Sequence, residues 1–150
     1  MGKKLTDNGG WFELQVDSDP KNLSIIADFL DDAMTAAGAR NEKDRFEVQL
    51  AVDEACTNII EHAYKGRERG KITIQCRLSE SKKEFIIKLI DTGKPFDPNT
   101  VPAPNTDASL EERTRGGYGI YFMKQVMQTV KYAFSDKGNE LTMVKLLSRG

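Results

Sequence analysis

The sequence predicts an α+β domain, a two-layer sandwich in which helices cover one face of a mixed, mostly antiparallel sheet. Two long segments with helical apolar spacing lie in the first half of the chain. Two strands with a period of two follow them, and a further helix and two strands end the chain. At 150 residues the chain fits a single domain, residues 1–150, which can bury a core without disulfides or metals.

The first expected elements are a strand and a helix. After a polar leader, Trp11–Val16 is short and rich in aromatic residues, which indicates a strand and is compatible with a position at the sheet edge. Ser18, Asp19 and Pro20 form a helix-start signal. Apolar residues then keep a helical period until Gly38: Leu23, Ile26, Ala27, Leu30, Met34 and Ala37.

The segment 44–64 predicts the central helix. Its core-facing stripe consists of Val48, Val52, Ala55 and Ile59. A polar row follows at spacings of four residues: Glu54, Asn58 and His62. We expect this row to lie on one flank, half-buried beside the apolar stripe. For one isolated helix, a solvated polar edge with an intrahelical hydrogen bond between Glu54 and Asn58 would be the favoured interpretation.

Two strands come next. Lys71–Leu78 alternates, with Ile72, Ile74, Cys76 and Leu78 on the expected core face. Phe85–Ile90 is more continuously apolar and should therefore be more central in the sheet. The polar turn between the two segments predicts a hairpin.

The strand at 85–90 changes abruptly into turn-forming residues at Asp91, which marks a candidate site. Residues 97–116 hold three prolines and little periodicity, apart from a candidate short helix at 110–113, and loops of this length are usually functional or disordered. Three glycines then open an amphipathic helix that continues to Val130: Gly116, Gly117 and Gly119. Strands at 131–135 and 140–147, joined by a turn, are expected to close the chain.

Composition excludes several classes of function. The net charge is −1, with 22 basic and 23 acidic residues interspersed, so nucleic acid is not an expected partner. Cys56 and Cys76 have neither metal-ligand spacing nor the density of a disulfide framework, and they are expected to be reduced core residues. No apolar run is long enough for a membrane span and no signal peptide is evident, so we expect a cytoplasmic protein without a membrane partner.

Three features suggest nucleotide chemistry when they are taken together. Glycines at a helix start attract a phosphate, although they also occur at ordinary loop ends. A carboxylate such as Asp91 at the end of a strand can accept a hydrogen bond from an exocyclic amine, although it also initiates turns. The amide oxygen of Asn58 suits Mg²⁺, and Glu54 one turn away can take a proton from a hydroxyl.

These motifs resemble those of the Bergerat-fold (GHKL) ATPases, and within them the anti-sigma-factor serine-protein kinases of the RsbW and SpoIIAB type. DEACTNIIEHAY is similar to the family's N-box, DTGKPFDP to its first glycine box and RGGYGIYFMKQVMQ to its second. The three motifs occur in the family's order, and the resemblance covers nearly the whole chain.

The resemblance implies ATP and Mg²⁺ as cofactors and assigns a role to each motif residue. Asp91 would contact the adenine amine, Asn58 would hold Mg²⁺ and Glu54 would be the catalytic base. Arg115 would lie near the terminal phosphate, and Thr142 would assist at adenine or be an ordinary surface threonine. The glycines implied at the nucleotide are Gly93, Gly116, Gly117 and Gly119, and a mobile ATP lid is implied near 97–116.

The resemblance also implies the partners. The chain would phosphorylate an anti-sigma-factor antagonist and sequester a sigma factor, and whether it forms a homodimer stays open. The first glycine box holds one glycine where many relatives have two, so the contacts of Lys94 stay open, and His62 is expected to be structural. Two alternatives are a non-catalytic, nucleotide-gated binding module and a metal-free hydrolase that uses Glu54 with Asp91 or Asp97.

Overall fold

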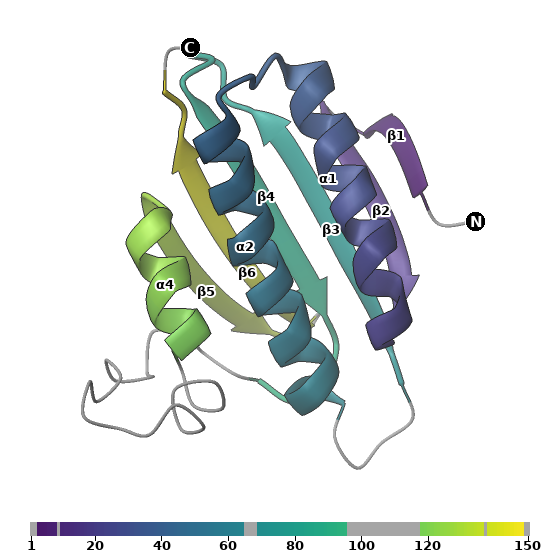
Figure 1. The fold of residues 1–150 in the computed structure, drawn as a ribbon. Coiled ribbons are helices and arrows are strands. Elements are labelled where there is room, and N and C mark those ends of the chain that lie inside the picture. The colour runs from purple at the N-terminus through teal and green to yellow at the C-terminus, as the bar shows by residue number, and fades with distance from the viewer. Residues whose placement is uncertain (1–2, 9, 65–68, 96–117, 137, 149–150) are drawn as a thin grey trace.

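The computed structural model describes residues 3–8, 10–64, 69–95, 118–136 and 138–148 of the chain. It has two layers, a six-stranded sheet and a layer of helices that covers one face of the sheet (Figure 1). The strand order is β1-β2-β3-β4-β6-β5, and neighbouring strands pair antiparallel. The predicted α+β sandwich is confirmed. In the part of the chain that the structure describes, no helix is long and apolar enough to cross a membrane.

The sheet and the helical layer come from all parts of the chain. The strands are β1 (Lys3–Asn8), β2 (Trp11–Asp17), β3 (Lys71–Leu78), β4 (Glu84–Asp91), β5 (Thr129–Ser135) and β6 (Gly138–Leu146). The helices are α1 (Leu23–Ala37), α2 (Glu42–Asn58) and α4 (Tyr118–Val126). A 3₁₀ turn, Pro20–Asn22, precedes α1, and a π-helix, Ile59–Ala63, continues α2.

Local sequence signals set the ends of the first two helices. The Asp19 side chain accepts a hydrogen bond from the backbone N–H of Lys21, which caps the 3₁₀ turn that leads into α1. Gly38 ends α1 in the left-handed conformation, with φ of 81°. Asn41 caps α2 by accepting from the backbone N–H of Asp44. The Asn41 cap fixes where α2 begins, and therefore which residues lie at the other end of this helix.

The core lies between the inner face of the sheet and the three helices. On β3 the buried residues are Ile72, Ile74 and Cys76, and on β4 every second residue is buried, as the alternation predicts, whereas Leu78 at the end of β3 is only partly buried. Cys56 and Cys76 are buried free thiols, which confirms the predicted core role, and burial raises the pKa of Cys76 to about 12. The largest fully buried side chains include Phe29, Leu30, Met34, Val48, Ile72, Ile74, Phe85, Ile87 and Met143.

The N-terminal edge of the sheet differs from the prediction. The polar leader forms β1, so the edge strand is β1 and the aromatic-rich strand β2 lies inside the sheet. An edge strand is held by backbone hydrogen bonds to one neighbour, and it therefore needs no apolar pattern. A search for apolar periodicity therefore did not predict β1, because its sequence is polar.

The C-terminal boundaries also differ. Helix α4 ends at Val126, short of the predicted Val130, and β5 begins at Thr129. Strand β6 begins at Gly138, two residues before the predicted start. β-branched residues such as Thr129 and Val130 favour a strand once a neighbouring strand is available for pairing. The predicted loop at 97–116, with its candidate short helix at 110–113, lies outside the described residues.

Candidate nucleotide site

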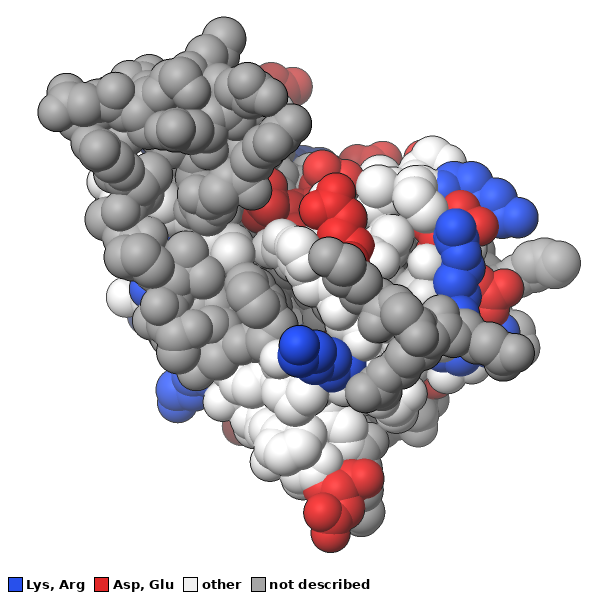
Figure 2. Space-filling view, turned by 90° about the horizontal axis from the view of Figure 1, so that it is seen from below, with Lys and Arg blue, Asp and Glu red and all other residues white. Residues whose placement is uncertain are grey.

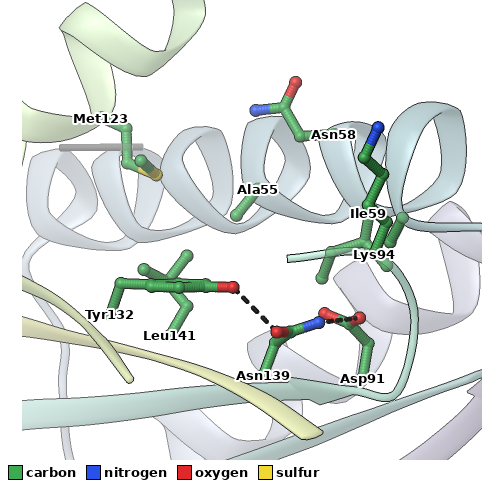
Figure 3. Close-up of a pocket in the computed structure, with 10 residues that line it drawn as sticks. Ala55, Asn58, Ile59, Asp91, Lys94, Met123, Tyr132, Asn139 and Leu141 are labelled. Carbon is green, nitrogen blue, oxygen red and sulfur yellow. Dashed lines mark hydrogen bonds between the residues drawn. The ribbon is translucent and has the colours of Figure 1, made fainter. Parts of the chain in front are cut away.

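A cavity opens between α2, α4 and the inner face of the sheet, at the end of the domain where β4 ends (Figure 3). Its lining is apolar on both sides and carries a few polar groups. An apolar slot with a small number of placed polar side chains is typical of small-molecule sites. The lining residues are Ala55, Asn58, Ile59, Ala63, Asp91, Lys94, Met123, Tyr132, Asn139 and Leu141.

Asp91 is held at the sheet side of this cavity. It is the last residue of β4, and the strand's alternation turns it to the inner face, where it is 6% exposed. Its Oδ1 accepts from the backbone N–H of Gly93 at 2.9 Å and from Nδ2 of Asn139 at 2.9 Å. The carboxylate therefore has a defined orientation.

Gly93 allows the chain to leave β4 close against the π-helix. A Cβ at this position would overlap the carbonyl of Ala63. The next residue, Lys94, donates its backbone N–H to that same carbonyl at 2.6 Å. A helix end leaves carbonyls without partners inside the helix, and the exit of β4 satisfies one of them. Gly93, which the resemblance implies at the nucleotide, thus lies beside the cavity, where the backbone that follows β4 contacts the π-helix.

The flank of α2 brings Glu54 and Asn58 to the same end of the domain, and both are half-buried as predicted. Asn58 lines the cavity. Burial raises the pKa of Glu54, and the neighbouring charges of Asp53 and Glu61 raise it further. Figure 2 views the molecule from this end and shows acidic side chains gathered there. Glu54 is therefore a better proton acceptor than an ordinary surface carboxylate.

His62 does not continue this row, so the prediction that it is half-buried was wrong. Its side chain is 51% exposed and lies 3.8 Å from the carboxylate of Glu61. Residues 59–63 form a π-helix, whose wider turn shifts later side chains around the helix axis relative to an α-helix. The i, i+4, i+8 spacing holds only as far as Asn58.

The structure describes only part of the second glycine motif. Arg115, Gly116 and Gly117 lie outside the described residues. Gly119 lies in the first turn of α4, where a Cβ would overlap the carboxylate of Glu54. The structure therefore brings the second glycine motif and the α2 flank into direct contact.

Thr142 is not at the cavity. On β6 the buried residues are Asn139, Leu141, Met143 and Lys145, so Thr142 points to the other face of the sheet, where it pairs with Lys88 and Lys131. The predicted adenine contact by Thr142 is corrected for this reason, and the alternative of an ordinary sheet-surface threonine fits its place.

Tyr132 and Asn139 are cavity residues that sequence reasoning missed. The sequence placed Asn139 in a turn, because the strand was expected to begin one residue later. Extending the alternation of Leu141 and Met143 back by two residues would have turned Asn139 inward. The hydroxyl of Tyr132 donates to Oδ1 of Asn139 at 2.8 Å.

Comparison with known proteins identifies the fold family. Residues 16–145 match the family model for the histidine kinase-like ATPase domain. The chain belongs to the histidine kinase-like ATPase family. It is 30% identical to the serine-protein kinase RsbW of Bacillus pumilus over 143 residues, which covers 91% of this chain and 86% of the relative. It is 28% identical to RsbW of Bacillus subtilis over 148 residues, or 96% of this chain and 90% of the relative.

A solved structure has the same fold. The RsbU and RsbW domains from Mycobacterium tuberculosis superpose with a TM-score of 0.66 at 16% identity. That match covers 93% of this chain and 32% of the other, so this chain spans about a third of its length. The histidine kinase-like ATPase fold of this chain is thus supported both by sequence and by structure.

Proposed function

We propose that this chain is an ATP-dependent serine/threonine-protein kinase that phosphorylates an anti-sigma-factor antagonist and, as an anti-sigma factor, sequesters a sigma factor. One observation carries the proposal. Asp91 is buried and oriented on one side of the cavity, while α2, on the other side, presents Asn58 and, one turn earlier, Glu54. These residues would supply a base acceptor, a metal ligand and a proton acceptor in one site.

The base would lie between the apolar side chains of Ile59, Met123 and Leu141. Among the described residues, Oδ1 of Asp91 receives two hydrogen bonds, so Oδ2 is the atom that would accept from an exocyclic amine. A base with a carbonyl at that position would place one acceptor against another. This chemistry supports adenine as the base.

Mg²⁺ would enter with the phosphates. In the described part of the chain no group of three His, Cys, Asp or Glu residues could hold a metal ion. Mg²⁺ commonly takes only one or two protein ligands and completes its shell with phosphate oxygens and water, which fits Asn58 as a single amide ligand. The acidic charges of Asp53, Glu54 and Glu61 near this end would also repel an uncompensated triphosphate. Donor chemistry and charge both fit a nucleotide that carries its own cation.

Glu54 would act as the general base. As the serine oxygen forms its bond to the γ-phosphorus, the bond from that phosphorus to the bridging oxygen breaks and ADP leaves. The serine proton passes to the Glu54 carboxylate. Phosphoryl transfer depends mainly on positioning and charge neutralisation. The raised pKa of Glu54 makes its carboxylate a stronger base, which suits the role.

Phosphoryl transfer from γ-labelled ATP tests the proposal. The wild type is incubated with ATP, Mg²⁺ and small antagonist proteins from the same genome, and phosphoserine is located by mass spectrometry. Glu54→Gln should bind ATP normally while transfer falls on the order of 10²- to 10⁴-fold.

Two results would redirect the proposal. ATP binding without transfer to any antagonist would favour a nucleotide-gated binding module. A parallel loss of ATP binding in Glu54→Gln would instead make Glu54 a structural residue.

A further inference from the structure

Three polar side chains form a row along the sheet side of the cavity. Tyr132 on β5, Asn139 on β6 and Asp91 on β4 are joined by hydrogen bonds of 2.8 and 2.9 Å (Figure 3). Asn139 is 3% exposed and Asp91 is 6% exposed, so water has little access to these bonds. The row is part of the interior of the domain, and it also lines the cavity.

Chemistry fixes the direction of every bond in the row. The Asp91 carboxylate and the carbonyl of Gly93 only accept hydrogen bonds, so the amide nitrogen of Asn139 must face them, at 2.9 Å from each. The amide oxygen of Asn139 is then left facing Tyr132, whose hydroxyl donates to it. Both hydrogens of the Asn139 amide are used, and the Asp91 carboxylate and the Gly93 carbonyl, which cannot donate, disfavour the flipped amide.

From this geometry we infer that Asn139, which accepts from Tyr132, is a positioning residue that holds the rotation of the Asp91 carboxylate, so that one of its oxygens faces the nucleotide base. Asn139 and the backbone of Gly93 both donate to Oδ1 of Asp91, which leaves Oδ2 for the ligand. The inference rests on the proposed function, because it presumes a base with an exocyclic amine. It adds a specificity determinant, since a carboxylate that could turn would distinguish less well between a base with the amine and one without it.

The roles of the two residues differ. Without Asn139, one of the two bonds that hold Oδ1 is lost, and the terminal torsion of an aspartate is intrinsically broad. Without the Tyr132 hydroxyl, Asn139 keeps its bonds to Asp91 and to the Gly93 carbonyl and loses only the donor to its amide oxygen. We therefore expect a larger effect from Asn139 than from Tyr132.

The test compares ATP with purine riboside 5′-triphosphate, which is ATP without the 6-amino group. Calorimetry with Mg²⁺ gives both affinities for each variant. The wild type should prefer ATP by about tenfold or more. Asn139→Leu should weaken ATP binding by about tenfold and leave the analogue within about twofold, so that the preference collapses.

Three further variants separate positioning from general structure. Asn139→Thr keeps one hydrogen-bond donor and should restore part of the preference. Tyr132→Phe should reduce the preference by about threefold. Tyr121→Phe removes a hydroxyl from the exposed part of α4 and should leave the preference unchanged. If Asn139→Leu does not fold by circular dichroism, Tyr132→Phe and Asn139→Thr carry the test, since both are conservative.

The variants test the positioning role of Asn139, and the wild type tests the nucleotide site itself. Equal losses for both nucleotides in the Asn139 and Tyr132 variants would overturn the positioning role and leave the proposed function intact. A wild type that binds both nucleotides equally would overturn the adenine assignment, and the positioning role with it. A wild type that binds neither would overturn the proposed nucleotide site.

Discussion

Gly119 in the first turn of α4 packs against the carboxylate of Glu54 on α2 so closely that a Cβ at Gly119 would overlap it. Gly119→Ala should therefore displace the end of the Glu54 side chain, and this displacement should offset part of the gain of up to about 1 kcal/mol that alanine brings as the better helix former. Phosphoryl transfer should fall with the displacement. Urea unfolding and transfer from γ-labelled ATP measure the two effects.

A double mutant isolates this contact. Glu54→Ala removes the side-chain atoms that the new methyl group would meet. In that background Gly119→Ala should stabilise the protein, by up to about 1 kcal/mol, because only the helix preference remains. If the substitution changed the stability of both backgrounds equally, contact with Glu54 would not be the reason for the glycine.

Asp91→Asn should weaken ATP binding by about 1 to 3 kcal/mol, or roughly tenfold to a hundredfold. The new amide oxygen can still accept from Gly93 and Asn139, so its NH₂ group would face the base. Two donors would then oppose each other. Calorimetry measures the loss, and Asp28→Asn, an exposed change on α1, is the matched control. Unchanged affinity in a folded Asp91→Asn protein would contradict the adenine contact.

Lys145 holds the end of α4 that is remote from the cavity. Its ammonium donates to Glu47 on α2 at 2.6 Å and to the carbonyl of Val126, the last residue of α4, at 2.8 Å. The two charged side chains are only 10% and 18% exposed. Lys145→Met would leave the partly buried Glu47 without its partner and should cost about 3 kcal/mol in urea unfolding.

The partner of Lys145 supplies the internal control. Replacing both residues, as Lys145→Met with Glu47→Leu, removes the stranded charge and should recover much of the stability. Lys131→Met, at an exposed position on β5, should change stability by less than about 0.5 kcal/mol. Additive losses in the double mutant would show that the ion pair is not what Lys145 contributes.

Local signals predicted the elements that build this site. The alternation of Ile72, Ile74 and Cys76 predicted β3, and the helical stripe with Gly38 as a stop predicted α1. The same signals placed Glu54 and Asn58 on one flank, because α2 is regular as far as Asn58. Periodicity within one segment was sufficient information for each of these features.

What the sequence did not predict depends on contacts between distant segments. The π-helix that turns His62 outward ends against the exit of β4, where Lys94 donates to Ala63. Asn139 is defined as a site residue by Asp91, which lies 48 positions earlier. The π-helix has no periodic signal in its own segment. The alternation of β6 can turn Asn139 inward, but it cannot show that Asn139 meets Asp91.

Glu54 should make the folded protein less stable at neutral pH than it would be with a neutral side chain. Burial, followed by the charges of Asp53 and Glu61, raises its folded-state pKa above the ordinary 4.5. Between those two pKa values the folded state binds more protons than the unfolded state, so stability falls as pH rises through this window. Glu54→Gln should therefore raise the melting temperature at neutral pH.

The pH dependence distinguishes this effect from a simple packing gain. Below the ordinary pKa of 4.5, wild-type Glu54 is protonated in both states, so the advantage of Glu54→Gln should shrink toward zero there. Glu42→Gln removes an exposed carboxylate from the first turn of the same helix, where the helix dipole favours negative charge. This control should not raise the melting temperature. Melting curves from acidic to neutral pH measure this dependence. A gain in melting temperature that does not change with pH, or a lower melting temperature of Glu54→Gln at neutral pH, would contradict a raised Glu54 pKa.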